Sequence, residues 1–429
     1  MLPVYNVLVL LLSPFLILYL LVFLYRRRDF RAGFWERLGL FPPATAVTAA
    51  AQRPADEPCF WIHAVSVGET MAALPLVRGV KARWPRCQIV FSTFTPAGRA
   101  IAQAKCPEVN QVLYFPLDVW PIVAAVAGRF RPDVFVLVET DIWPTWLYVL
   151  ARKNVPAVMV NGRISQRRLR LRPFYREVLA RFSFLCMQTE IDAERVVRVG
   201  IDRAHVMVTG NMKFALAASK QQDPQALRAE LGLSDGARLL IAGSTHPGEE
   251  VEVLRCYQQL RQHDKKLFLL VAPRHPERVE EVENLFRAQG LACARRSRAR
   301  GYPTPPVLLL DTLGELSKAY ALGTFIFVGG SLVRRGGHNI LEPASWGKPI
   351  FFGPYMDNYS NIAGSLEREG AAIRVHNGRE LAEQIERLSN NPARLLEMGR
   401  KAALFVAQNQ GSLEKNLEVI ESVLRQRPK

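Results

Sequence analysis

The sequence lacks the short motifs that mark several common enzyme classes. It contains no GxxxxGKS or GxxxxGKT loop, which argues against a P-loop ATPase, and no GxSxG turn, which argues against an α/β-hydrolase. It has no DxD pair to hold a divalent metal on a diphosphate, and His246 and His275 belong to no HxH, HxxxH or HExxH pattern. We therefore expect neither a metal nor another cofactor, so helix dipoles and basic side chains would have to neutralise a leaving group.

Cysteine is scarce, and acidic residues are outnumbered. The six cysteines show no CxxC spacing and lie mostly in apolar segments, as reduced core residues do. The chain has 56 Lys and Arg against 39 Asp and Glu, a formal net charge of +17. This surplus favours an anionic partner: a nucleic acid, an acidic membrane surface or a phosphorylated substrate. With 429 residues, the chain has room for two or three domains.

The N-terminus carries a long uncharged apolar run. As a helix, residues 4–25 would span roughly 33 Å at 1.5 Å per residue, enough to cross a bilayer. Four arginines follow this run and no basic side chain precedes it, which is the reverse of a cleaved signal peptide. We expect a single-pass anchor at residues 1–25, a basic juxtamembrane segment and loop at 26–58, and the remainder of the chain in the cytoplasm. A deeply inserted monotopic helix is the alternative. Because both arrangements hold the chain at a membrane, a membrane surface and a phosphorylated lipid are the anionic partners that we expect first.

From residue 59 on, runs rich in Val, Ile and Phe alternate with helical patterns at βα spacing, which predicts parallel sheets covered on both faces. We expect two doubly wound Rossmann-like domains, at 59–214 and 237–393, with a cleft between them. The polar segment 215–236 is the expected linker, and helices at 394–429 could pack back on the first domain. The expected strands are 59–64, 88–93, 112–115, 134–139, 157–161, 184–188 and 205–208, then 238–243, 267–272, 307–310, 324–328, 349–352 and 371–375.

Ligands of open parallel sheets bind beyond the carboxyl ends of the strands, so polar residues there are the first candidates. In the first domain a tight turn leads through Ser66 and Gly68 to Glu69, which is either a helix cap or a general base. Glu139 ends a very apolar strand, and Lys213 is its expected partner, in a structural salt bridge or a catalytic pair.

A run of arginines follows the strand at 157–161. Seven arginines lie within residues 163–181, beginning with Arg163, Arg167 and Arg168. They could form a solvated helix face, but the planar guanidinium also suits phosphate.

In the second domain, residues 325–354 read as a strand, a turn rich in glycine and arginine, a helix start and another strand. The glycine pairs at 329–330 and 336–337 would let backbone N–H groups approach an anion, and a helix beginning near His338 would point its positive end at that anion. Glu342, one turn into the helix, could bind a ribose hydroxyl. The alternative is an ordinary βαβ connection whose glycines only make turns.

These segments carry motifs of a known family. In chain order they are HAVSVGE, STFTPAG, FPLD, VETDIWP, NGR, GNMKF, GSTH, PRHPER, GEL, and GGHNILEP followed by GPYMDN. From about Arg27 to Leu424 the chain resembles the 3-deoxy-D-manno-octulosonic acid (Kdo) transferases of lipopolysaccharide inner-core assembly. The resemblance implies a GT-B fold, CMP-Kdo as donor, and a phosphorylated lipid A precursor in the inner membrane as acceptor. It further implies an inverting, metal-independent glycosyltransferase with no nucleic acid partner.

The resemblance also assigns roles. The general base of the family matches Glu69, and its transition-state-stabilising pair matches Glu139 and Lys213. Its CMP contacts match Pro273, Arg274, Gly314, Glu315, Leu316, Asn339, Ile340, Leu341 and Glu342. As further candidates for the donor phosphate or sugar we take Ser244, His275, Gly336, Gly337 and His338. The acceptor candidates are Ser66, Gly68, Arg163, Arg167 and Arg168.

Two other functions stay open. A second enzyme of the same fold, such as a UDP-N-acetylglucosamine 2-epimerase, would share the architecture, but the expected anchor and basic face argue against it. A basic, membrane-tethered nucleic-acid-binding protein would bind oligonucleotides with strong salt dependence, and it would leave Glu69, Glu139 and Glu342 unexplained.

Overall fold

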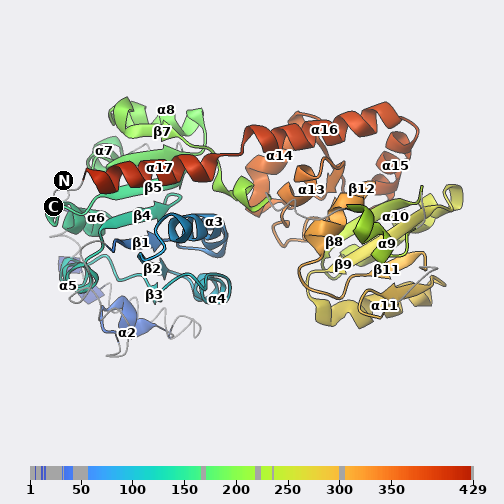
Figure 1. Ribbon diagram of the computed structural model, residues 1–429, viewed down its shortest axis with the longest axis horizontal. Coiled ribbons are helices and arrows are strands. Elements are labelled where there is room, and N and C mark those ends of the chain that lie inside the picture. Colours follow the sequence, from blue (N-terminus) through green and yellow to red (C-terminus); the bar gives the residue numbers. More distant parts are fainter. Residues whose placement is uncertain are drawn as a thin grey trace. The chain divides into compact units, whose positions relative to one another are not determined.

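The computed structural model describes residues 5, 11–12, 14–15, 31, 33–41, 57–165, 171–217, 224–233, 236–298 and 305–426. The chain divides into two compact units (Figure 1). Unit 1 comprises Met1–Ala215 with Gln410–Lys429, and unit 2 comprises Leu216–Asn409.

Unit 1 is built on a parallel sheet of seven strands in the order β3-β2-β1-β4-β5-β6-β7. All seven expected strands are present, each within one residue of its expected bounds. They are β1 (Cys59–His63), β2 (Gln88–Thr93), β3 (Gln111–Tyr114), β4 (Val134–Val138), β5 (Ala157–Gly162), β6 (Phe184–Met187) and β7 (Val206–Val208). β1 and β4 are buried along their whole length, as expected for strands covered on both faces.

The helices of unit 1 cover both faces of this sheet. They are α2 (Phe34–Arg37), α3 (Val67–Arg83), α4 (Pro96–Lys105), α5 (Trp120–Phe130), α6 (Pro144–Arg152), α7 (Arg172–Leu179), α8 (Glu190–Val199) and α17 (Ser412–Arg425). Apolar residues of α5, α6, α7 and α8 share one core with the strands, in which Trp61 packs against Phe130 and Trp146 with ring centroids 5.1 and 4.7 Å apart. The apolar faces of these four helices are therefore buried in a single core with the strands.

Unit 2 repeats this architecture, again with seven parallel strands, in the order β10-β11-β9-β8-β12-β13-β14. Six were expected and the edge strand β10 was missed, because its three residues end in an arginine and form no apolar run. The strands are β8 (Arg238–Thr245), β9 (Leu267–Pro273), β10 (Cys293–Arg295), β11 (Val307–Leu309), β12 (Phe325–Val328), β13 (Ile350–Phe352) and β14 (Ala372–Arg374). The helices are α9 (Pro224–Glu230), α10 (Glu249–His263), α11 (Val279–Ala288), α12 (Leu316–Ala319), α13 (Leu341–Ser345), α14 (Ser360–Arg368), α15 (Gly378–Ser389) and α16 (Pro392–Gln408).

The helix expected to begin near His338 was placed too early. The helix α13 begins at Leu341 and has five residues. Gly336 and Gly337 adopt φ angles of 83° and 71°, a left-handed conformation that cannot belong to a right-handed helix. Asn339 then accepts the N–H of Leu341, the first residue of α13, with its side-chain oxygen at 3.1 Å.

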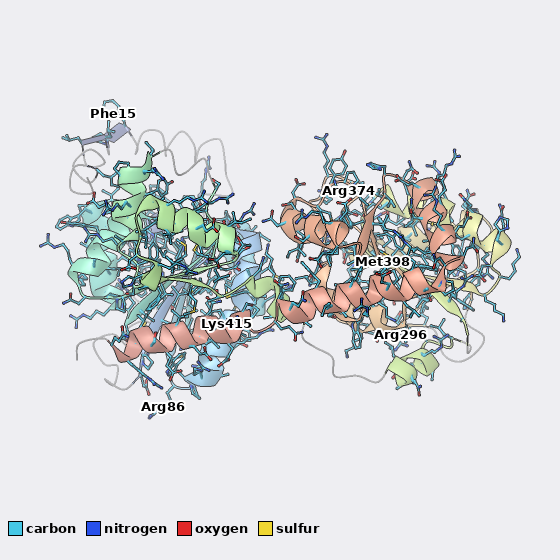
Figure 2. All side chains as sticks on the ribbon, turned by 90° about the horizontal axis from the view of Figure 1, so that it is seen from above. Phe15, Arg86, Arg296, Arg374, Met398 and Lys415 are labelled. Carbon is cyan, nitrogen blue, oxygen red and sulfur yellow. The ribbon has the colours of Figure 1, made fainter. Side chains whose placement is uncertain are left out.

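The two C-terminal helices belong to different units. Figure 2 labels Met398 on α16, which packs in the core of unit 2, and Lys415 on α17, which belongs to unit 1. Asn416 of α17 is fully buried and accepts a hydrogen bond from the Thr209 hydroxyl at 3.3 Å. The last helix of the chain thus completes the first unit.

The anchor expected at residues 1–25 lies almost entirely outside the described residues. Within the ranges given above, no helix has the length and apolar character needed to cross a membrane.

Candidate active site

Glu69 lies in the first turn of α3, just beyond the carboxyl end of β1. The backbone N–H of Glu69 donates to Ser66 Oγ at 3.4 Å, and Glu69 Oε2 accepts the N–H of Val65 at 2.5 Å. The helix-capping role, one of the two readings of this residue, is therefore present. The side chain is also buried, with 9% of its surface exposed.

Burial gives Glu69 a second property. It raises the pKa of the carboxyl group to about 7, helped by the negative charge of Glu139 and opposed by the hydrogen bond from Val65. A carboxyl that changes protonation near neutral pH is suited to accept a proton during a reaction.

Glu380 shows how helix capping alone affects the pKa of a glutamate, because it is a capping residue that is not deeply buried beside a second carboxylate. It accepts the N–H of His376 at 2.8 Å, and its own N–H donates to the cap residue Asn377 at 2.9 Å, the same two bonds that Glu69 makes. Its slight burial acts upward, but the hydrogen bonds from His376 lower its pKa. Capping therefore does not account for the raised pKa of Glu69, and the buried, negatively charged surroundings do.

Glu139 follows β4 at the same edge of the sheet. Its φ angle of 68° is left-handed, a conformation that costs a non-glycine residue about 1–3 kcal/mol and often marks a functional position. Burial raises its pKa, while the positive charges of Lys213 and Arg163 lower it. The structure thus brings Glu139 and Lys213 together, adds Arg163 to them, and places the Glu139 charge close enough to act on Glu69.

The other acceptor candidates are only partly placed. Ser66 is engaged as the cap of α3, and a side chain added at Gly68 would meet nothing closer than Ser66 Oγ at 3.9 Å, so this turn is open. Arg163 is exposed just beyond β5. Arg167 and Arg168 lie outside the described residues.

His63 is a residue of this site to which sequence reasoning gave no role. It is fully buried, and its Nε2 accepts the indole N–H of Trp143 at 3.0 Å. Because an indole N–H can only donate, the ring proton of neutral His63 must sit on Nδ1, which lies 3.1 Å from the carbonyl oxygen of Ser92. Burial lowers its pKa to about 3, so the ring is neutral and ties the loop after Glu139 to β1. Its position at the end of a strand in the HAVSVGE motif was the available signal.

In unit 2, the first glycine pair does not face a ligand. Glu249, the first residue of α10, is fully buried and accepts four backbone N–H groups, from His246, Gly330, Ser331 and Leu332, at 2.7–3.0 Å. The anion that this turn binds is therefore a side chain of the same chain, and our expectation that Gly330 helps to bind a ligand anion was wrong.

The second glycine pair is also engaged internally. The N–H of Gly337 donates to the Gly330 oxygen at 2.8 Å, and that of His338 donates to the Gly329 oxygen at 3.2 Å. A Cβ at Gly337 would lie 2.2 Å from Met356 Sδ. The reading in which these glycines make turns describes them better.

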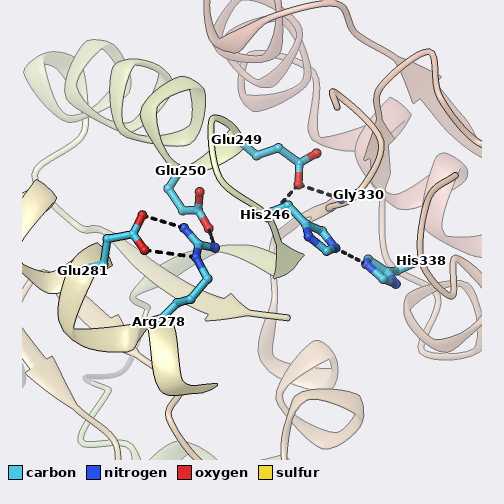
Figure 3. A network of polar contacts seen from close by, with 7 residues as sticks. All are labelled: His246, Glu249, Glu250, Arg278, Glu281, Gly330 and His338. Atoms are coloured by element: carbon cyan, nitrogen blue, oxygen red, sulfur yellow. Dashed lines mark hydrogen bonds and ion pairs between the residues drawn. The ribbon is translucent and has the colours of Figure 1, made fainter. Parts of the chain in front are cut away.

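What unit 2 presents at this edge is a group of three histidines and an arginine, His246, His275, His338 and Arg274, of which Figure 3 shows His246 and His338. His246 Nε2 and His338 Nε2 are 2.8 Å apart, so one ring donates to the other, and the rings stack at 9°. His275 meets His246 edge-on with centroids 5.9 Å apart. Burial, then nearby positive charge that includes Arg274, lowers the pKa of His246 and of His338 to about 4. His246, which belongs to no metal-binding pattern in the sequence, thus joins His275, His338 and Arg274.

The remaining CMP-matching residues fall on three neighbouring turns. Pro273 ends β9, and the N–H of Arg274 donates to Thr245 of β8 at 2.9 Å. Asn339 Nδ2 donates to Glu342 Oε1 at 2.9 Å. Trp346, directly after α13, donates its indole N–H to the carbonyl oxygen of Ser317 in α12 at 2.8 Å.

That last bond connects the two stretches that match CMP contacts. They are Gly314, Glu315 and Leu316 before and in α12, and Asn339, Ile340, Leu341 and Glu342 before and in α13. Glu315 pairs with Arg296 at 3.3 Å, and Ser244 at the end of β8 has a φ angle of 57°. In the part of the chain that the structure describes, no group of three or more His, Cys, Asp or Glu side chains is placed to hold a metal ion.

Comparisons with known proteins bear on both units. A sequence profile of the 3-deoxy-D-manno-octulosonic-acid transferase (kdotransferase) family matches residues 32–216. A 3-deoxy-D-manno-octulosonic acid transferase of Bordetella pertussis is 32% identical over 420 residues, which cover 94% of this chain and 96% of that protein. A bifunctional glycosyltransferase/methyltransferase of Fusobacterium nucleatum is 33% identical over 345 residues, 78% of this chain and 53% of that protein, so the chain spans about half the length of this relative.

Solved structures show the same architecture. The UDP-GlcNAc 2-epimerase of Neisseria meningitidis, bound to UDP-GlcNAc, has a TM-score of 0.54 and 11% identity, covering 85% of this chain and all of that one. At this identity the likeness shows the fold alone, a GT-B-like α/β fold.

Proposed function

The chain belongs to the 3-deoxy-D-manno-octulosonic acid (Kdo) transferase family, and from this we propose that it transfers Kdo from CMP-Kdo to a phosphorylated lipid A precursor in lipopolysaccharide core biosynthesis. In this scheme unit 1 supplies the base and unit 2 binds the donor. The observation that carries the proposal is Glu69: a buried carboxyl with a pKa of about 7, beside a second carboxylate and two cations.

We propose that Glu69 accepts the proton of an acceptor hydroxyl as that oxygen attacks the anomeric carbon of Kdo. The bond from this carbon to the phosphate oxygen breaks on the opposite face, CMP leaves with the electron pair, and the configuration inverts. General-base assistance of this kind contributes roughly 10²- to 10⁴-fold in rate. Lys213, held near Glu139, would stabilise the carboxylate of Kdo or the charge that develops on it.

The donor phosphate needs positive charge or N–H donors. The backbone N–H groups of the glycine turn and the short α13 supply less than we expected, because most of those N–H groups are engaged within unit 2. We therefore assign this role to the imidazole and guanidinium groups of His246, His275, His338 and Arg274. The ribose would lie against Glu342 and Asn339.

The test is turnover of CMP-Kdo by the purified full chain, with and without a phosphorylated lipid A precursor, followed by mass spectrometry of the lipid. We expect release of CMP only when the lipid is present, and a lipid product heavier by one or more Kdo residues. Lipid-independent conversion of a UDP-sugar would instead identify a GT-B-like epimerase. Salt-dependent oligonucleotide binding without turnover would identify a nucleic-acid-binding protein.

We also propose that residues 1–25 attach the enzyme to the inner membrane, with the two units on the cytoplasmic side. The support is the uncharged run at residues 4–25 followed by four arginines. Recovery of the full chain in the membrane fraction, and of a chain starting at residue 33 in the supernatant, would support it; a full chain that stays in the supernatant would refute it.

A further inference from the structure

Asn161, at the end of β5, lies between the two residues assigned to transition-state stabilisation. Its side chain is fully buried. The amide Nδ2 donates to Glu139 Oε1 at 3.3 Å, and the amide Oδ1 accepts the N–H of Met212 at 3.0 Å. Met212 directly precedes Lys213, so one amide bridges the carboxylate of Glu139 and the backbone that carries Lys213.

The segment bearing Lys213 is fixed from a second direction. Gln188 Nε2 donates to the backbone oxygen of Asn161 at 2.9 Å, and its Oε1 accepts Asn211 Nδ2 at 3.1 Å. The Oδ1 of Asn211 in turn accepts the N–H of Lys213 at 2.9 Å. Three amide side chains from three parts of the chain thus form a closed path through the backbone that carries Lys213, and Asn161 is where this path meets Glu139.

The backbone at this point is strained on both strands. Glu139 and Asn161 both have left-handed φ angles, 68° and 55°; Glu139 directly follows β4, and Asn161 lies near the end of the adjacent parallel strand β5. Asparagine tolerates this conformation better than other side-chain-bearing residues. Strained residues persist where their surroundings overdetermine them, and they cluster at functional sites.

We propose that Asn161 is a positioning residue for the Glu139–Lys213 pair, holding the carboxylate and the cation-bearing backbone in a single arrangement through its amide. The inference rests on the proposed function, because it takes the roles of Glu139 and Lys213 from it. The amide N–H also favours the ionised form of Glu139, whose charge acts on Glu69. Asn161 should therefore influence both the rate and its pH dependence.

Two substitutions test this. Asn161→Gly keeps the left-handed backbone and removes the amide. Asn161→Asp is isosteric and keeps the acceptor for Met212, but it replaces the donor to Glu139 with a negatively charged oxygen, which adds to the charges of Glu139 and Asp141 that act on Glu69. The matched control is Asn154, an exposed asparagine of the same unit with a φ angle of 54°, changed to the same two residues.

We expect kcat to fall roughly 10- to 100-fold in both Asn161 variants, because this is the rate effect of losing one hydrogen bond to a charged group. The KM for CMP-Kdo and the KM for the lipid acceptor should change little. In Asn161→Asp the acid limb of the pH–rate profile should also move to higher pH, because added negative charge raises the pKa of Glu69. Both Asn154 variants should match the wild type. The midpoint of the limb does not depend on how much enzyme is folded, so it remains informative if a variant is partly unfolded.

Two results would overturn the inference. One is a kcat for both Asn161 variants within about twofold of the Asn154 controls, while Glu139→Gln and Lys213→Ala are strongly impaired. The other is an unmoved acid limb in Asn161→Asp. Full activity of Glu139→Gln and Lys213→Ala would be a different failure, since it would remove the proposed roles of the pair itself.

Discussion

The two units place a glutamate at the same point of similar sheets and use it differently. Glu69 lies in the first turn of the helix after β1, and Glu249 is the first residue of the helix after β8. In chain order each of these strands is the first of its sheet, and each lies near the sheet centre. Burial raises the pKa of both carboxyl groups, but at Glu249 four backbone N–H groups oppose that rise, and at Glu69 the main opposing group is the Val65 N–H. The two glutamates thus differ in the number of backbone N–H groups that they accept: four at Glu249, which fix the turn at 330–332, and chiefly that of Val65 at Glu69.

The same contrast holds for the groups around each glutamate. Unit 1 gathers buried carboxyls with raised pKa values, flanked by Lys213 and Arg163. Unit 2 gathers His246 and His338, whose pKa values are lowered to about 4. Under the proposed function, the first group supplies the proton acceptor and the second supplies nitrogen donors for the donor phosphate.

Replacing Glu249 should give the largest effect on folding. Glu249→Gln leaves buried N–H groups of the turn at 330–332 without an acceptor, which should cost about 3–5 kcal/mol of stability in unit 2. Glu69→Gln keeps an amide oxygen that can accept the Val65 N–H, so it should cost at most about 1 kcal/mol. Hydrogen exchange in denaturant, followed on peptides of each unit, measures the loss of stability of both variants. Equal losses of stability would contradict the difference between the two glutamates.

Replacing Gly337 should have a smaller effect. Gly337→Ala adds a methyl group 2.2 Å from Met356 Sδ at a φ angle of 71°, whereas Gly236→Ala adds one at a φ angle of 75° with nothing within 4 Å. The backbone cost is shared, so the difference should be the overpacking cost, about 1–3 kcal/mol. Equal melting temperatures for the two variants would show that tight packing is not why glycine is required in this turn.

The pH profile should give the smallest effect and the sharpest view of unit 1. A base must be deprotonated, so kcat/KM should rise with pH through about 7, the pKa of Glu69. Since the charge of Glu139 raises that pKa, Glu139→Gln should move the midpoint to lower pH, by about one unit or less. Although the variant is slower, the midpoint of its pH profile can be determined from relative rates. A midpoint that is unchanged or higher would contradict the effect of the Glu139 charge on the pKa of Glu69.

Sequence reasoning located most of the fold because buried parallel strands are continuous apolar runs. It missed β10, since a three-residue edge strand ending in arginine leaves no such pattern. It placed α13 too early, since the glycines that suggested an anion site also hold the chain in left-handed conformations. Both errors concern short segments whose conformation depends on neighbours.

The site was harder to predict where a residue's role depends on distant partners. Glu69, Glu139 and Lys213 could be proposed from motifs and strand ends. The binding of the glycine turn at 329–332 to Glu249 could not be predicted, because Glu249 lies about 80 residues earlier in the sequence. Asn161 and His63 were likewise invisible as organising residues, since their hydrogen-bond partners come from other strands and loops.

The division of labour between the units can be measured with one variant and one control. In Glu69→Gln we expect the single-turnover transfer of Kdo to fall roughly 10²- to 10⁴-fold, while calorimetry finds CMP bound with the wild-type Kd. Glu380→Gln makes the same change at the capping glutamate of α15 and should leave both quantities unchanged. Transfer by Glu69→Gln at close to the wild-type rate would contradict the account, because Glu69 would then not be the base.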